Sequence, residues 1–134
     1  MKSRDTLVRL KQFQVDDKRR RIAQLQTMIA EFTRMTTELD REIAGEEQRA
    51  NISDPSHFAY PTYARAARVR RDNLANSLGD LRDKLEAAQD QLKEAGEELS
   101  KAQSQETRDH AAERLVDVVA ERRAAERGEA LRRA

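Results

Sequence analysis

Few side chains in this sequence have the chemistry that catalysis or metal binding requires, and their spacing favours neither. The two histidines, His57 and His110, are far apart in the sequence, and there is no cysteine. The adjacent carboxylates at residues 46–47 and 97–98 are typical of the solvated face of a coiled coil. The sequence contains no glycine-rich phosphate loop, no HExxH and no nucleophile elbow. We therefore interpret each histidine as a surface residue and expect no enzyme, no metal site and no cofactor.

The elements that would position any site are indicated by the composition. Of the 134 residues, 38% are charged, 37% are hydrophobic and only 4% are aromatic, which is typical of long helices that bury a narrow stripe. The formal net charge of +1 provides no overall field that would favour nucleic acid or an acidic substrate. No apolar run follows Lys2 and Arg4, so we expect no signal peptide, and no stretch approaches the 20 or so apolar residues of a membrane span. The lack of cysteine fits the cytoplasm.

Two apolar seams with helical spacing flank one interruption, residues 51–62, which holds both prolines. The first seam consists of Ile22, Leu25, Ile29, Phe32, Leu39 and Ile43, and the second of Leu74, Leu78, Leu81, Leu85, Ala88, Leu92, Ala95, Leu99 and Ala102. Residues that recur every three or four positions share one face of a helix. We predict an all-α protein with a single domain over residues 1–134. Its two long helices, at about 4–50 and about 62–127, form an antiparallel coiled-coil hairpin around a tip at 51–61.

A hairpin that folds near residue 56 places position i opposite roughly position 113 − i. This register sets Leu39 beside Leu74, Phe32 beside Leu81 and Ile29 beside Leu85. It also sets the basic run 18–21 beside the acidic stretch 90–94. A parallel dimer would instead place each basic segment against its own copy, so the charge pattern favours the hairpin.

Within the interruption, Asp54 followed by Pro55 is typical of a helix N-cap and first helical position, which predicts a short helical turn over 55–59. Pro61 is expected to start the second long helix in the same way.

Three of the five aromatic residues, Phe58, Tyr60 and Tyr63, lie in or next to the interruption. One interpretation is that these rings fold back and cap the end of the coiled coil. The other is an exposed aromatic patch that binds a protein partner, because tyrosine provides a large contact area at low entropic cost. The sequence favours both interpretations about equally.

The second seam fails beyond Ala102, where Glu106 and Asp109 occupy the next seam positions. The register leaves residues beyond about 110 without a partner on the first helix, so the C-terminal end of the second helix should project. Apolar residues still mark this end, namely Leu115, Val116, Val118 and Val119. We interpret them as a docking element, with homodimerisation through the same residues as the alternative.

Three stretches carry a resemblance to a known family: LVRLKQFQVDDKRRRIAQLQ, FAYPTYARAARVRRDNL and LRDKLEAAQDQLKEAGEELSKAQ. Up to about residue 110 the chain resembles the flagellar export protein FliJ family, most specifically at its opening and at Tyr60 and Tyr63. The resemblance implies a small cytoplasmic component of the flagellar type III protein export apparatus, peripherally associated with the inner face of the cell membrane. In that family the hairpin resembles the central stalk of rotary ATPases.

The resemblance also implies partners and contact residues. The end that bears both termini inserts into the hexameric export ATPase, and the coiled coil nearer the tip contacts the cytoplasmic domain of the membrane export gate. Escort of filament and hook export chaperones is a further implied role. The residues assigned to the gate are Phe58, Tyr60, Tyr63, Ala67, Arg70 and Leu74, with Leu39 and Ile43 as candidates on the first helix. Two of these residues depart from the family pattern: Ala67 is small where a larger apolar residue is common, and Arg70 is charged. The resemblance assigns no residues to the ATPase contact; our own hypothesis for the ATPase-facing end names Leu7, Leu10, Leu115, Val116, Val118 and Val119.

Two functions of other classes remain as alternatives. One is a homodimeric coiled-coil scaffold without a role in export. The other is a nucleic-acid-binding helical arm that uses residues 18–21 and the arginines of 65–71. Four consecutive basic residues surround a full helical turn, and no aromatic residues alternate with them for base stacking. We therefore expect no nucleic-acid partner.

Overall fold

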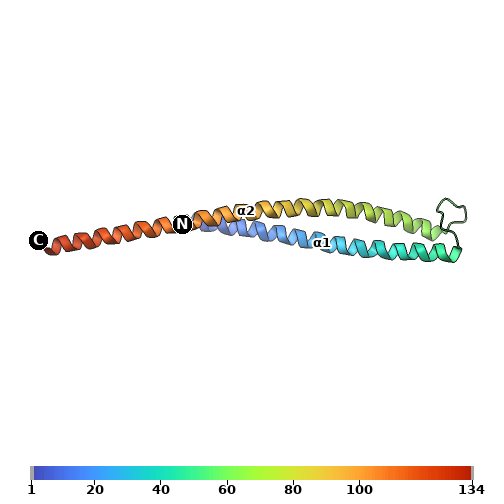
Figure 1. Cartoon of the computed structure of the whole chain (residues 1–134), viewed down its shortest axis with the longest axis horizontal. Helices are drawn as coiled ribbons and strands as arrows, with labels where there is room; N and C mark the ends of the chain where they lie inside the picture. The colour runs from blue at the N-terminus through green and yellow to red at the C-terminus, as the bar shows by residue number, and fades with distance from the viewer. Residues whose placement is uncertain (1, 134) are drawn as a thin grey trace. The chain divides into compact units, whose positions relative to one another are not determined.

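A computed structural model describes the backbone of residues 2–133 and the side chains of residues 5–133. It contains two long helices, α1 over Lys2–Ala50 and α2 over Thr62–Arg133. Residues 51–61 connect them (Figure 1). The described residues contain no strand. The all-α prediction with two long helices is confirmed.

Helix α2 continues to Arg133, past the expected end near residue 127. The stretch from Glu121 to Arg133 consists almost entirely of alanine, glutamate and arginine, which have high helix propensity. Arg132 and Arg133 also lie in the last turn, where a positive charge interacts favourably with the helix dipole.

The chain divides into two compact units, and both helices contribute to each. We call Lys18–Gln91 the hairpin unit, and Met1–Asp17 with Leu92–Ala134 the terminal unit.

In the hairpin unit, α1 and α2 pack in antiparallel directions because the short connecting segment reverses the chain (Figure 1). One cluster buries Leu25, Leu81 and Ala88, with Ile22, Ile29, Phe32 and Leu85 packed against it. A second buries Leu39, Ile43 and Ala67, with Leu74 against it. The expected pairings of Leu39 with Leu74, Phe32 with Leu81 and Ile29 with Leu85 each fall within one cluster, as the register predicts.

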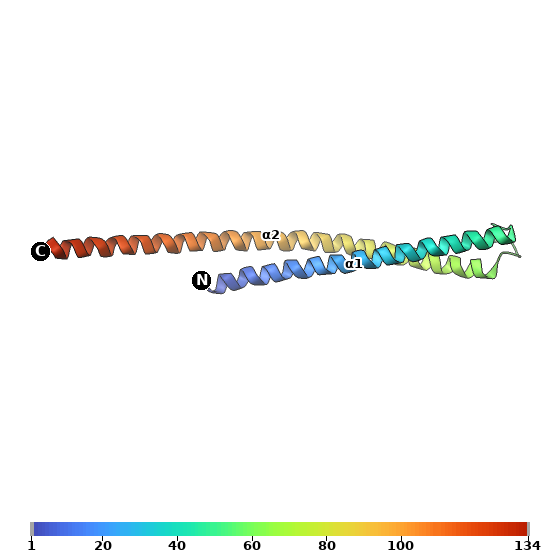
Figure 2. The ribbon, with the colours of Figure 1, turned by 90° about the horizontal axis from the view of Figure 1, so that it is seen from below.

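In the terminal unit, the first part of α1 lies along α2, also in the antiparallel sense. Lys11 Nζ is 2.8 Å from Glu98 Oε2, and farther toward the N-terminus Asp5 Oδ1 is 3.6 Å from His110 Nε2. Val15 and Ala95 are buried in this unit. Beyond these contacts α2 continues past the start of α1, as Figure 2 shows. From Arg114 to Arg133 the side chains are exposed, and the projecting C-terminal helix end is confirmed.

Helix α1 ends in a Schellman motif, the arrangement in which a left-handed residue closes the last turn. Asn51 has a φ of 55°. Its backbone N–H donates to the carbonyl oxygen of Gln48, and the Ile52 N–H donates to that of Glu47. Asparagine tolerates this conformation better than other residues with a side chain, glycine apart.

The expected helical turn over 55–59 is wrong, because the segment forms two reverse turns instead. The His57 N–H donates to the Asp54 carbonyl oxygen, and the Tyr60 N–H donates to that of His57. The Asp54 side chain accepts bonds from the backbone N–H and the hydroxyl of Ser56, which lower the pKa of Asp54. Such an Asx turn competes with helix formation.

Pro61 lies one residue before α2, and its carbonyl oxygen accepts the first helical hydrogen bond, from Arg65. Neither helix is, over its described residues, both long enough and apolar enough to cross a membrane.

Candidate functional site

The first turns of α2 separate inward-facing from outward-facing side chains next to the connecting segment. Tyr60, at the end of the connecting segment, and Ala64 and Ala67, on α2, are spaced by four and three residues and are all buried. The small side chains of the two alanines allow α1 to approach closely. Tyr63 and Arg70, which are also helically spaced, face outward.

A compact polar network holds Tyr60 in its inward position. Its hydroxyl donates to Glu47 Oε1 over 3.1 Å, and Arg68 Nε donates to the same hydroxyl over 2.8 Å. Arg68 Nη2 closes the triangle by donating to Glu47 Oε1 over 3.0 Å. The Tyr60 hydroxyl and then Glu47 raise the pKa of the Arg68 guanidinium. The network therefore ties α2 to the last turns of α1 through charge-assisted hydrogen bonds.

The outward side of the same helical turns carries the best candidate binding surface. We define the tip face as the shallow hollow of about 130 Å³ lined by Met35, Glu38, Leu39, Glu42, Tyr63 and Arg70. The Tyr63 hydroxyl donates to Glu42 Oε2 over 2.7 Å, which fixes the ring across the two helices although the residue is 52% exposed. This bond, followed by the negative charge of Glu42, raises the pKa of the Tyr63 phenol.

The structure brings only part of the proposed gate-binding set to the surface. Tyr63 and Arg70 line the tip face. Phe58 is 93% exposed on the connecting segment, where its ring stacks on that of His57 at a centroid distance of 4.8 Å. The remaining three pack toward α1: Tyr60 and Ala67 are buried, and Leu74 is half-buried. The first-helix candidates are inward as well, since Leu39 and Ile43 are both buried.

The tip aromatics divide between the two orientations, and the binding of a partner by the exposed rings stays a prediction. Tyr60 folds back and is only 4% exposed, whereas Phe58 and Tyr63 face outward. The difference arises from the polar partners that α1 offers, Glu47 for Tyr60 and Glu42 for Tyr63.

On the α1 side of the tip face, sequence reasoning named Leu39 but missed Met35, Glu38 and Glu42. It also missed the pairing of Glu47 with Arg68, although the register places Arg68 close to residue 45. A search for opposite charges near the expected register would have found this pair. The Tyr63–Glu42 contact has no such signal, because the register places Tyr63 opposite residue 50.

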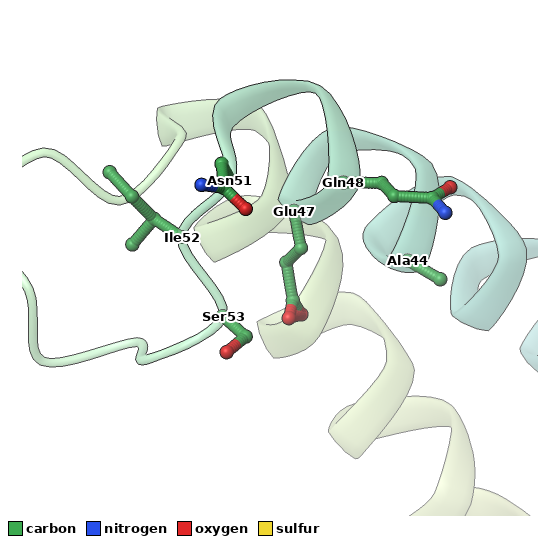
Figure 3. A pocket seen from close by; sticks show the side chains of 6 residues that line it. All are labelled: Ala44, Glu47, Gln48, Asn51, Ile52 and Ser53. Carbon is green, nitrogen blue, oxygen red and sulfur yellow. The ribbon is translucent and has the colours of Figure 1, made fainter.

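A second, more open hollow of about 450 Å³ lies at the end of α1. Its lining is formed by Ala44, Glu47, Gln48, Asn51, Ile52 and Ser53 (Figure 3). Glu47 is the one titratable group in this lining, and it points toward α2, where Arg68 and Tyr60 bind it. The remaining lining offers amide, hydroxyl and apolar groups, so we assign no chemistry to this hollow.

The residues assigned to the ATPase lie in the terminal unit and are all exposed. We define the terminal patch as Leu115, Val116, Val118 and Val119, of which Val116 is 66% exposed. Because Asp5 contacts His110, the terminal patch lies beyond the part of α2 that pairs with the described start of α1. Leu7 and Leu10, also exposed, lie on the paired part of α1.

Comparison with protein-family models, curated proteins and solved structures finds no match to this chain.

Proposed function

We propose that this protein is a component of the flagellar type III export apparatus that links the export ATPase to the membrane export gate. The proposal combines the sequence resemblance with two exposed surfaces on a two-helix coiled coil. In it the terminal patch binds the ATPase, the tip face binds the cytoplasmic domain of the gate, and the protein promotes the export of flagellar subunits.

The observation that carries the proposal is the terminal patch. Four large aliphatic side chains within five residues are exposed on a helix that has no second helix beside it in the described structure. Leaving such a patch in water forfeits roughly 25 cal/mol for each Å² that a partner would cover. An amphipathic helix of this kind is suited to a groove or to a second coiled coil.

The tip face supports a separate protein contact. An aromatic ring anchored by a hydrogen bond and an arginine beside a hollow are the side-chain types that most often dominate binding energy at interfaces. Glu42 holds the Tyr63 side chain in place in the free protein. Binding of a partner at the tip face therefore costs less side-chain entropy.

The first test is a binding titration of the full chain against the export ATPase. In the double variant Val116→Asp with Val119→Asp, we expect affinity to fall at least about tenfold, which corresponds to about 1.4 kcal/mol. The control is Ala124→Asp, which adds a negative charge at an exposed position of the same helical segment, on the side opposite the terminal patch. Equal affinity of the Val variant and the control would refute the ATPase assignment.

The second test is a titration against the cytoplasmic domain of the export gate with Tyr63→Ala. We expect weaker gate binding and unchanged ATPase binding, because the substitution removes the ring from the tip face alone. Val69→Ala is the matched control, since Val69 is exposed on the same helix but does not line the tip face. Failure of the full chain to bind either partner would refute the function as a whole.

The terminal patch also favours a second candidate function, a homodimeric coiled-coil scaffold. In that case light scattering would give twice the 15.4 kDa mass of one chain, and Val116→Asp with Val119→Asp would return the mass to that of a monomer. A monomer mass for the unmodified protein at all concentrations would exclude the scaffold.

A further inference from the structure

Three side chains that the proposed function does not use meet in the terminal unit. His110 Nε2 is 3.4 Å from Glu106 Oε1 and 3.6 Å from Asp5 Oδ1. One potential ligand atom from each of the three residues lies within 4.8 Å of the others, and all three residues are half-buried. Asp5 belongs to α1, whereas Glu106 and His110 belong to α2.

The local sequence explains why the three meet. Glu106 and His110 are four residues apart and therefore share one face of α2. Glu106 occupies a seam position, so this face is the one that turns toward α1. Asp5 then reaches the pair from α1 at the level where the apolar seam has ended.

One carboxylate oxygen of the cluster lacks a hydrogen-bond partner within the described part of the chain. Asp5 Oδ1 is shielded from water and has no hydrogen-bond partner among the residues that the structure describes. A shielded acceptor without a partner is destabilising. A bound cation would supply the missing contact.

We propose that Asp5, Glu106 and His110 form a binding site for a divalent cation of the Zn²⁺ type. Zn²⁺ accepts imidazole nitrogen and carboxylate oxygen together, whereas Mg²⁺ and Ca²⁺ prefer oxygen ligands only. The fourth position would be filled by water.

The separations fit such an ion. Bonds of about 2.1 Å to a tetrahedral ion place neighbouring ligand atoms about 3.4 Å apart. The distances from His110 Nε2 to the two carboxylate oxygens, 3.4 and 3.6 Å, are close to that value. The second ring nitrogen, His110 Nδ1, is 3.9 Å from Glu113 Oε2, which is beyond hydrogen-bond distance.

Binding would join the two helices of the terminal unit, because the ligands come from both. A site shared by α1 and α2 is formed only when they are paired, so the ion would stabilise that pairing by mass action. This inference stands independently of any role in export.

The experiment is calorimetric titration of the full chain with ZnCl₂ at neutral pH, with MgCl₂ as a comparison. We expect one Zn²⁺ per chain and no comparable binding of Mg²⁺. His110→Gln and Glu106→Gln should each weaken Zn²⁺ binding at least about tenfold, because even loss of a residue that only supports a ligand costs about that much. His57→Gln, which removes the other histidine, is the matched control and should bind as the unmodified protein does.

A second readout separates the site from adventitious binding by surface histidine. Hydrogen exchange of the backbone N–H groups in the first turns of α1 should slow on addition of Zn²⁺ in the unmodified protein and in His57→Gln, but not in His110→Gln. Circular dichroism before metal is added checks that each variant is folded. Absence of Zn²⁺ binding, or binding that His110→Gln leaves unchanged, would overturn the proposal.

Discussion

At the scale of single residues, the end of α1 depends on the backbone conformation of Asn51. Its φ of 55° lies in the left-handed region, where a Cβ atom is disfavoured by about 1–2 kcal/mol and asparagine is better tolerated than most residues. The two Schellman hydrogen bonds that follow satisfy carbonyl groups that would otherwise lack partners.

Asn51→Ala should therefore destabilise the hairpin by about 1 kcal/mol, whereas Asn51→Gly should be neutral or slightly stabilising. Urea unfolding followed by circular dichroism measures both free energies of unfolding. Equal effects of alanine and glycine would show that the conformation of this residue does not limit the turn.

A second residue-scale prediction concerns ionisation of Tyr63. Because Glu42 raises its pKa, the phenol should titrate above the usual value of about 10. The protonated form is favoured by folding, so this interaction stabilises the protein below pH 10 and is lost as pH rises through the folded pKa. With Tyr60→Phe as background, Tyr63 is the sole tyrosine and ultraviolet titration reports it directly.

Glu42→Gln in the same background should lower the pKa of Tyr63 toward the ordinary value. Glu38→Gln, which changes a neighbouring acidic residue of the tip face, is the matched control. If Glu42→Gln left the titration curve of Tyr63 unchanged, the hydrogen bond between Tyr63 and Glu42 would be contradicted.

At the scale of elements, the pairing of α1 and α2 changes character along the hairpin unit. Farther from the connecting segment it rests on the apolar clusters around Leu25 and around Leu39. Close to that segment, the triangle of Tyr60, Glu47 and Arg68 adds directional contacts. A polar network with its partners satisfied specifies one register, because a shifted helix would leave those groups unpaired.

Leu25→Ala should lower the free energy of unfolding by about 2–5 kcal/mol, the largest loss expected at a seam position. The reason is that the Leu25 side chain is only 1% exposed and lies in the first cluster. Met28→Ala, three residues away on the same helix at a side chain that is 40% exposed, is the control and should cost clearly less than Leu25→Ala. Thermal unfolding followed by circular dichroism measures both. Similar losses for the two would mean that the seam is not the main source of stability.

At the scale of the whole molecule, α2 has two environments. Up to His110 it is paired with α1, and from Arg114 to Arg133 its side chains are exposed. The second part has helix-forming composition but no cluster of buried side chains among its described residues.

A chain that ends after Glu113 should lose helical circular dichroism signal and yet keep its unfolding midpoint within about 2 °C. The reason is that the removed residues contribute no buried contacts to the paired helices. A midpoint that falls by about 5 °C or more would indicate that the terminal patch is covered in solution, either by a second copy or by its own chain.

The sequence by itself determined the helical class, the hairpin and its approximate register. Apolar residues at every third or fourth position specify which face of each helix is buried, and both prolines lie in one short segment. These are local or periodic properties that single residues barely disturb. Leu39 lies with Leu74, and Phe32 with Leu81, for this reason.

Only the tertiary structure decided which ring turns inward, how Asp54 shapes the connecting segment, and which distant polar groups meet. Tyr60, in the connecting segment, and Tyr63, in the first turn of α2, are three residues apart and look alike in sequence, yet one is buried and one is exposed. Asp5 and His110 are unremarkable separately and become a candidate metal site only because α1 and α2 run side by side at that level. Such contacts depend on the exact register, to the residue, between segments far apart in the chain and on individual side-chain rotamers, neither of which a periodic pattern encodes.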